Sequence, residues 1–178
     1  MEAGTLRQPR VWLPVVAGVG VAVCLGVYGR LHEPAGALDV PAFIRLQDTK
    51  VWLATAAAAL GVIQLVSALA MYGKLPTARW IPGLHRWSGR LALLFSLPVA
   101  VHCLYALGFR AGEPRVLAHS LLGCVFYGAF AAKMLLISRP GEGRPWVVPL
   151  AGGLVLTTLT GLWLSSALWF FTTFGPGW

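Results

Sequence analysis

Five long runs of apolar residues, separated by short polar stretches, organise the 178-residue chain. The runs are continuously apolar rather than alternating between apolar and polar positions, which favours helices over strands. Each run has about the 20 residues that a helix needs to cross the hydrocarbon core of a bilayer. We therefore predict five transmembrane helices, at about residues 11–29, 51–72, 89–109, 116–138 and 147–171.

The predicted connections between the helices are short, with one exception. The exception is residues 30–50, in which Val40 to Asp48 mixes apolar and charged residues in a pattern that favours a short helix on the surface. No linker or internal repeat interrupts the chain, so we predict one domain over residues 1–178. The three short connections are residues 74–88, 110–115 and 139–146.

The composition supports a membrane protein. Apolar residues make up 57% of the chain, charged residues make up 11%, and the mean hydropathy is +0.72. A soluble globular protein carries about 25% charged residues, so this chain cannot cover a water-facing surface. Soluble enzymes, disordered tails and nucleic-acid-binding modules are therefore excluded. We predict an all-α integral membrane helical bundle in contact with membrane lipid.

The net charge of +8 is distributed unevenly between the two sides of the predicted bundle. One side, with the N-terminal segment, carries nine Lys and Arg against two acidic residues, a net charge of 9 − 2 = +7. The other side carries five basic and four acidic residues, a net charge of 5 − 4 = +1. Since cytoplasmic loops are enriched in Lys and Arg, we predict a multi-pass protein of the plasma membrane with a cytoplasmic N-terminus and an external C-terminus.

Two histidines inside predicted spans are the leading candidates for chemistry, because an ionisable group in the hydrocarbon region usually has a function. His102 and His119 lie ten residues before and seven residues after the turn at residue 112. At 1.5 Å per residue they are roughly 15 and 10 Å from that turn, so they share a depth in the outer half of the membrane. Two facing imidazoles are a known axial pair for haem iron. Two alternatives remain open at this point: unrelated histidines bonded to neighbouring groups, and a metal site of another kind.

The surroundings of this pair agree with a haem site. Gly123 and Ala106 lie one helical turn from the two histidines and leave room for a porphyrin. Arg110 and Arg115 lie near both histidines and could meet haem propionates. Pro98 lies one turn before His102 and favours a kink in its helix.

A second haem is possible but not favoured. His85 lies 17 residues before His102, about 25 Å away along a helix, at the cytoplasmic edge. A second haem would need a further ligand at that edge, and Met134 and Met71 are the candidates. The alternatives for His85 are a position at the membrane interface or a contact with a quinone or a propionate.

The other polar residues within the spans have simpler interpretations. Gln64 is predicted to join two helices by hydrogen bonds. Lys133 lies near the end of its span and is predicted to extend its ammonium to the cytoplasmic surface. Cys24, Cys103 and Cys124 form no metal-binding pattern and are interpreted as small apolar packing residues.

The stretch His85-Arg86-Trp87-Ser88-Gly89-Arg90, followed by His102 and Tyr105, resembles the HRxxGR…H entry of the ferric-reductase-like group of transmembrane b-type cytochromes. The chain also resembles small uncharacterised actinobacterial membrane proteins of five helices. The cytochrome resemblance implies four to six helices, one or two b haems held by histidines, and electron transfer across the membrane. Because 17 residues separate the two histidines here, it carries over best to the single pair His102 and His119. Reductase activity would require a partner subunit that carries a flavin or nucleotide.

We therefore expect a membrane protein that binds one haem b and transfers electrons between a quinol pool and a redox partner on the outer face. Whether it is an enzyme, as an oxidoreductase subunit, is left open. The alternative is a non-catalytic structural or assembly subunit of a larger membrane complex, in which the histidines only pack. A transporter is less favoured because no acidic residue falls inside a predicted span.

Overall fold

A computed structural model describes residues 11–34, 46–139 and 145–175 of the chain. Within this part, five helical rods are long and apolar enough to cross a membrane, which confirms the predicted all-α architecture and the five helices of spanning length. Two rods contain a π-helical segment, η1 in the third and η2 in the fifth. In chain order the elements are α1 (Trp12–Leu31), α2 (Leu46–Met71), α3 (Ile81–His102), η1 (Cys103–Leu107), α4 (Pro114–Ile137), α5 (Val147–Trp163), η2 (Leu164–Leu168) and α6 (Trp169–Phe174).

The start of α3 differs most from the sequence prediction. The helix begins at Ile81 rather than near residue 89, so the connection before it is shorter than expected. Pro82 in the first turn favours this start. The polar residues that follow remain helical because several of them bond to α2 rather than to water. The predicted surface helix over Val40–Asp48 lies mostly outside the described residues, and Leu46 already belongs to α2.

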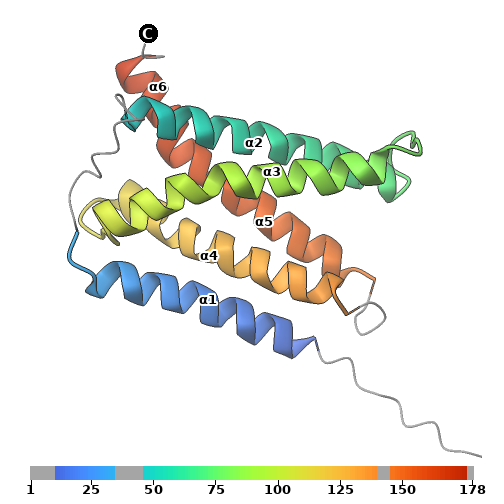
Figure 1. Cartoon of the computed structure of the whole chain (residues 1–178), viewed down its shortest axis with the longest axis horizontal. Coiled ribbons are helices and arrows are strands. Elements are labelled where there is room, and N and C mark those ends of the chain that lie inside the picture. Colours follow the sequence, from blue (N-terminus) through green and yellow to red (C-terminus); the bar gives the residue numbers. More distant parts are fainter. Residues whose placement is uncertain (1–10, 35–45, 140–144, 176–178) are drawn as a thin grey trace, which may run out of the picture.

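Each rod packs along one or two others (Figure 1), and η1 of the third rod also contacts α1 at one end of the bundle. Helix α3 packs along α2, α2 also contacts α5, α5 packs along α4, and α4 packs along α1. Helices α3 and α4 are joined by residues 108–113 and run antiparallel, yet each packs mainly against other helices. The short connection predicts close packing between these two helices, and the structure instead leaves a cavity between them at one end.

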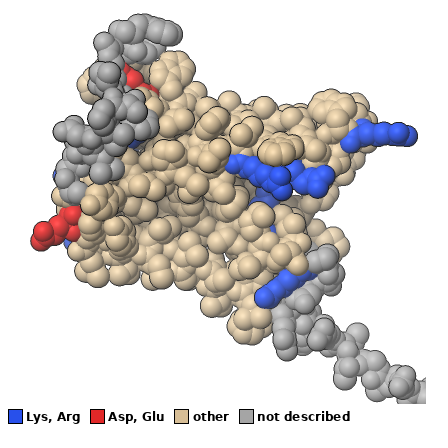
Figure 2. Space-filling model, viewed as in Figure 1, with Lys and Arg blue, Asp and Glu red and all other residues tan. Residues whose placement is uncertain are grey.

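The two ends of the bundle are named here by the side chains they hold. The His119 end contains the C-terminal ends of α1, η1 and α6 and the N-terminal ends of α2 and α4. The Lys133 end contains the opposite helix ends, and Figure 1 shows it on the right. Among the described residues, the Lys133 end carries basic side chains and no acidic ones, and Figure 2 shows these cations on the visible face. They are Lys74, Arg79, Arg86, Arg90, Lys133 and Arg139.

Helix α1 is attached to the bundle mainly through α4. Gly18 and Gly128 bring the two backbones together: a Cβ added to Gly18 would lie 2.5 Å from the Gly128 carbonyl oxygen. Such small residues allow membrane helices to pack closely without a hydrophobic driving force. The rest of α1 is largely exposed and faces the surroundings with side chains such as Val19 and Val23.

The centre of the bundle is a small apolar cluster formed by Ala57, Phe126 and Leu159, from α2, α4 and α5. Phe126 is 3% exposed. Phe126 and Leu159 also line the two cavities of the bundle, one toward each end. The cluster therefore lies between the cavity at the His119 end and the cavity at the Lys133 end.

Candidate functional site

A cavity of about 340 Å³ lies at the His119 end, bounded by all five helical rods. This volume falls within the range of roughly 300–1,000 Å³ that is typical of pockets for small molecules and cofactors. Most of its lining is apolar and comes from α2, α3 and α4. The polar groups gather on the walls formed by α4 and η2. An apolar chamber with a few convergent polar groups is the usual form of a ligand site.

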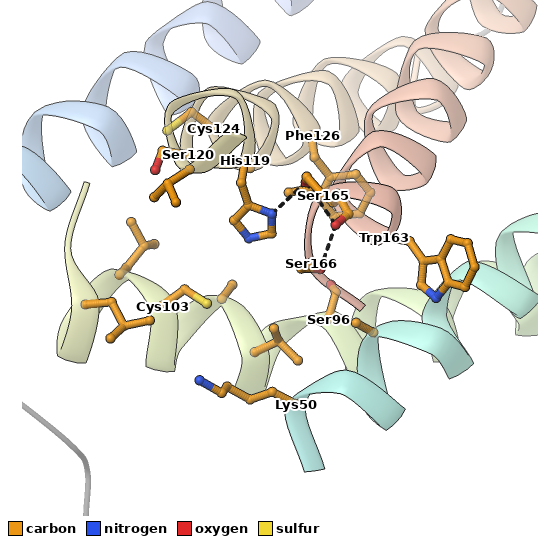
Figure 3. A pocket seen from close by; sticks show the side chains of 18 of the residues that line it. Lys50, Ser96, Cys103, His119, Ser120, Cys124, Phe126, Trp163, Ser165 and Ser166 are labelled. Carbon is orange, nitrogen blue, oxygen red and sulfur yellow. Dashed lines mark hydrogen bonds between the residues drawn. The ribbon is translucent and has the colours of Figure 1, made fainter. Parts of the chain in front are cut away.

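His119 is the central polar group of this cavity. Its Nδ1 lies 2.9 Å from the Ser165 hydroxyl oxygen, in η2, and the Ser165 hydroxyl donates in turn to the Gly161 carbonyl at 2.7 Å. Figure 3 shows the imidazole between the helices with Ser165 beside it. A histidine held through one ring nitrogen presents the other in a fixed direction, as metal-binding histidines do.

Arg115 supplies a cation at the mouth of the cavity, one helical turn before His119. Its Nη1 donates to the Ser165 carbonyl at 2.9 Å, and its guanidinium lies 3.8 Å from the centre of the Trp169 ring. It also forms an ion pair with Glu113 at 3.5 Å. These three contacts fix Arg115 against α6 and η2, so its charge lies beside the chamber.

The wall opposite His119 is formed by the end of the third rod. Cys103, the first residue of η1, faces the chamber, and Lys50 from α2 lies beside this wall (Figure 3). Both π-helical segments, η1 and η2, contribute residues to the cavity. Single π turns within α-helices are frequent at functional sites, and two of them border the same chamber here.

The structure brings together four of the residues predicted from the sequence and leaves three outside the cavity. His119, Arg110, Arg115 and Gly123 all line it. His102, His85 and Met134 do not.

His102 is nevertheless a buried group, with 8% of its surface exposed. It precedes Cys103, which lines the cavity, and the Lys50 ammonium lies within electrostatic reach of it. Its side chain does not line the chamber that His119 faces. In this arrangement the two imidazoles do not share one cavity.

His85 lies in a polar cluster between α2 and α3 at the Lys133 end. Its Nδ1 lies 2.9 Å from the Ser67 hydroxyl oxygen, and the Gln64 amide donates to the His85 carbonyl and, at 2.7 Å, to the Ser88 hydroxyl. Gln64 therefore joins the two helices, in line with its prediction as an interhelical contact. Met134, the predicted partner of His85, is 48% exposed on α4.

A second, smaller cavity of about 60 Å³ lies beside this cluster. Lys133 lines it together with Gln64, Phe130 and Gly152. A Cβ added to Gly152 would lie 3.8 Å from the Lys133 ammonium. Lys133 therefore extends along the space between α4 and α5. Its position in the sequence alone predicts a side chain that reaches the surface.

Several residues of the two sites were not predicted from the sequence. Ser165 holds His119, yet serines in membrane helices usually bond to their own helix and carry no distinctive pattern. Lys50 and Cys103 lie at the cavity wall. Outside the two cavities, His32 stacks between Tyr28 and Tyr105, with ring centroids 5.0 Å apart in both pairs.

For a haem, the residues of the cavity fit one axial position. His119 has a ring nitrogen fixed by Ser165, the walls are apolar, and Arg110 and Arg115 are the cations expected for propionates. Within the described ranges, no group of three or more His, Cys, Asp or Glu side chains could hold a metal ion.

Comparison with known proteins gives a family and no assigned function. No curated protein matches the chain, and no solved structure matches it. The model of a family of unknown function, DUF6529, matches residues 11–178, which include all five helical rods. The chain therefore belongs to the DUF6529 family.

Proposed function

We propose that this protein binds one haem b in the cavity at the His119 end and transfers electrons within the membrane. The observation that carries the proposal is the fixed orientation of His119, which Ser165 holds by its Nδ1 in an apolar cavity. The haem would supply one-electron redox chemistry. The chain itself supplies the axial imidazole, the cations beside the chamber and the exclusion of water.

His119 would bind the haem iron in this proposal, and Arg115 and Arg110 would offset the negative charge of the propionates. Gly123 lines the α4 wall without a side chain. The wall opposite His119 contains Cys103 (Figure 3). His102, the residue before Cys103, does not line the cavity in this structure; we propose that its side chain turns into the chamber and serves as the second ligand of the haem-bound state.

The charge distribution supports an orientation for the electron path. The Lys133 end carries the excess of Lys and Arg, which favours a cytoplasmic location in the plasma membrane. The N-terminus is then cytoplasmic and the haem lies in the outer half of the bilayer. Electrons would pass from a quinol pool to a redox partner on the outer face.

Absorption spectroscopy of the purified full-length protein, produced with haem precursor, tests this proposal. The expected result is a Soret band with a sharp α band after reduction, as for two imidazole ligands. His119→Ala should abolish the bound haem, and His85→Ala, the control from the other end, should leave the spectrum unchanged.

The variant His102→Ala separates the two ligands. A change from a low-spin to a high-spin spectrum supports the pair His102 and His119, and an unchanged spectrum removes His102 from the site. A protein that remains colourless with haem supplied, or that loses its haem in His85→Ala and keeps it in His119→Ala, would overturn the proposal.

A further inference from the structure

The smaller cavity at the Lys133 end is lined by the positive charge of Lys133, and no acidic side chain among the described residues forms an ion pair with it. Lys133 lines this cavity from α4. Among the residues that the structure describes, the one carboxylate ion pair is formed by Glu113 and Arg115, at the opposite end. A cation at the edge of the hydrocarbon region is costly unless it meets an anion or water, so the cavity favours a negatively charged occupant.

The other polar group of the cavity is already engaged. The Gln64 amide donates both to the His85 carbonyl and to the Ser88 hydroxyl. The remaining lining residues are apolar or glycine, among them Phe130, Gly152 and Leu156. Lys133 is therefore the group that would recognise an occupant, and it would do so mainly through charge.

The size of the cavity sets the size of the group that enters. At about 60 Å³, with about 10–15 Å³ needed for each water, it has room for roughly four to six waters. That is the space of a phosphate group with its four oxygens. A complete porphyrin or a ring with several substituents would require the helices to separate.

The depth of Lys133 matches the level of lipid phosphates. Helix α4 has 24 residues and is therefore about 36 Å long, slightly longer than a hydrocarbon core of about 30 Å. Lys133 precedes the last residue of α4, Ile137, by four positions, or about 6 Å. Its Cα thus lies just inside the boundary between headgroups and hydrocarbon.

The cavity is also accessible from the side of the bundle. Lys133 and Phe130 are only half-buried, and α3 and α4, which both border the cavity, do not pack along each other. Figure 2 shows Lys and Arg side chains around a hollow at this end of the molecule. Clusters of basic residues near the cytoplasmic ends of membrane helices attract anionic lipids.

From these observations we propose that the Lys133 cavity is a binding site for the phosphate of an anionic phospholipid. Lys133 provides the inner contact, and the exposed Arg86 and Arg90 of α3 favour the approach of negatively charged headgroups. This site is separate from the haem cavity, because the cluster of Ala57, Phe126 and Leu159 lies between them. The proposal does not depend on haem binding.

Native mass spectrometry of the full-length protein, titrated with phosphatidylglycerol or with phosphatidylcholine, tests the proposal. We expect one phosphatidylglycerol to bind in preference to phosphatidylcholine. Lys133→Gln should reduce that preference about five-fold, the effect of one basic residue near an anionic lipid surface. Lys133→Arg should retain it, and Lys74→Gln, an exposed residue at the same end, is the matched control.

Three results would overturn the proposal. The first is an equal loss of preference in Lys74→Gln and Lys133→Gln, which would indicate a diffuse surface effect. The second is displacement of the bound lipid by inorganic phosphate at equal concentration, which would identify a soluble anion as the occupant. The third is a gain in phosphatidylglycerol binding in Glu142→Gln, which would show that Lys133 is paired within the chain. Should Lys133→Gln fail to fold, Gly152→Ala, which fills space beside the ammonium, provides the same comparison.

Discussion

The two cavities of this bundle differ in how their cationic and imidazole groups are held. At the His119 end, the imidazole and the Arg115 guanidinium are both fixed by bonds to η2, and the chamber beside them is large. At the Lys133 end, the imidazole of His85 is bonded between two packed helices, and the space beside it is small. The first arrangement presents polar groups to a ligand, whereas the second uses most of them to join helices.

The difference shows which histidine is available for chemistry. His119 points into a chamber that its hydrogen-bond partner leaves open. His85 contributes to the contact between α2 and α3, and its neighbour Gln64 closes that contact with two further bonds.

Removing the wall between the two cavities should have the largest effect. Phe126→Ala takes a buried ring from the central cluster, and a buried Phe replaced by Ala costs about 3–5 kcal/mol of unfolding free energy. We expect a marked fall in the thermal unfolding temperature of the purified protein, measured with a thiol-reactive dye. Phe174→Ala, at a ring that is 65% exposed, is the control and should change little. Equal effects of the two variants would show that the central cluster does not separate the chambers.

Removing the hydroxyl group that holds His119 should have the next largest effect. Ser165→Ala removes the partner of Nδ1, and removal of a group that orients a metal ligand reduces affinity by about 10–100-fold. We expect weaker haem retention, measured by titration of haem into the apoprotein. Ser166→Ala is the matched control, because the Ser166 hydroxyl donates to the Leu162 carbonyl and does not contact His119. A Ser166→Ala protein that loses as much affinity as Ser165→Ala would contradict the role of the His119–Ser165 bond.

Weakening the contact between α2 and α3 should have the smallest effect. Gln64→Leu removes two interhelical hydrogen bonds, which average about 0.6 kcal/mol each in membrane proteins. We expect a small fall in the thermal unfolding temperature and an unchanged absorption spectrum. A lost or shifted haem spectrum in Gln64→Leu would mean that the two ends of the bundle are coupled.

Hydropathy and charge predict most of the fold, because the requirement for about 20 apolar residues to cross a bilayer leaves few alternatives. The start of α3 was predicted eight residues too late, because a hydropathy criterion assigns the polar residues His85, Arg86 and Ser88 to a loop. In the structure, His85 and Ser88 bond to residues of α2. A polar residue that is satisfied by a neighbouring helix cannot be distinguished from a loop residue in a single sequence.

The candidate site was predicted only in part, and the reason lies in helix rotation. The depth of a residue follows from its distance to the nearest turn, which is why His119, Arg115 and Gly123 were predicted in one region. The direction of a side chain depends on every residue between it and the turn. The π-helical segment η1 lies between His102 and the connection to α4, and it changes the rotation that regular α-helical geometry would give. The sequence does not reveal that segment.

The attachment of α1 through α4 has a consequence for how the protein is made. The Gly18–Gly128 contact joins residues that are 110 positions apart, so α1 enters the bilayer long before its partner has been synthesised. Helix α1 must remain there as an isolated span, which its high hydropathy allows. Helices α2 and α3, by contrast, are consecutive and can pair as soon as the second of them is inserted. Biogenesis should therefore proceed through an early α2–α3 hairpin, with α1 joining only after α4 has left the translocation machinery.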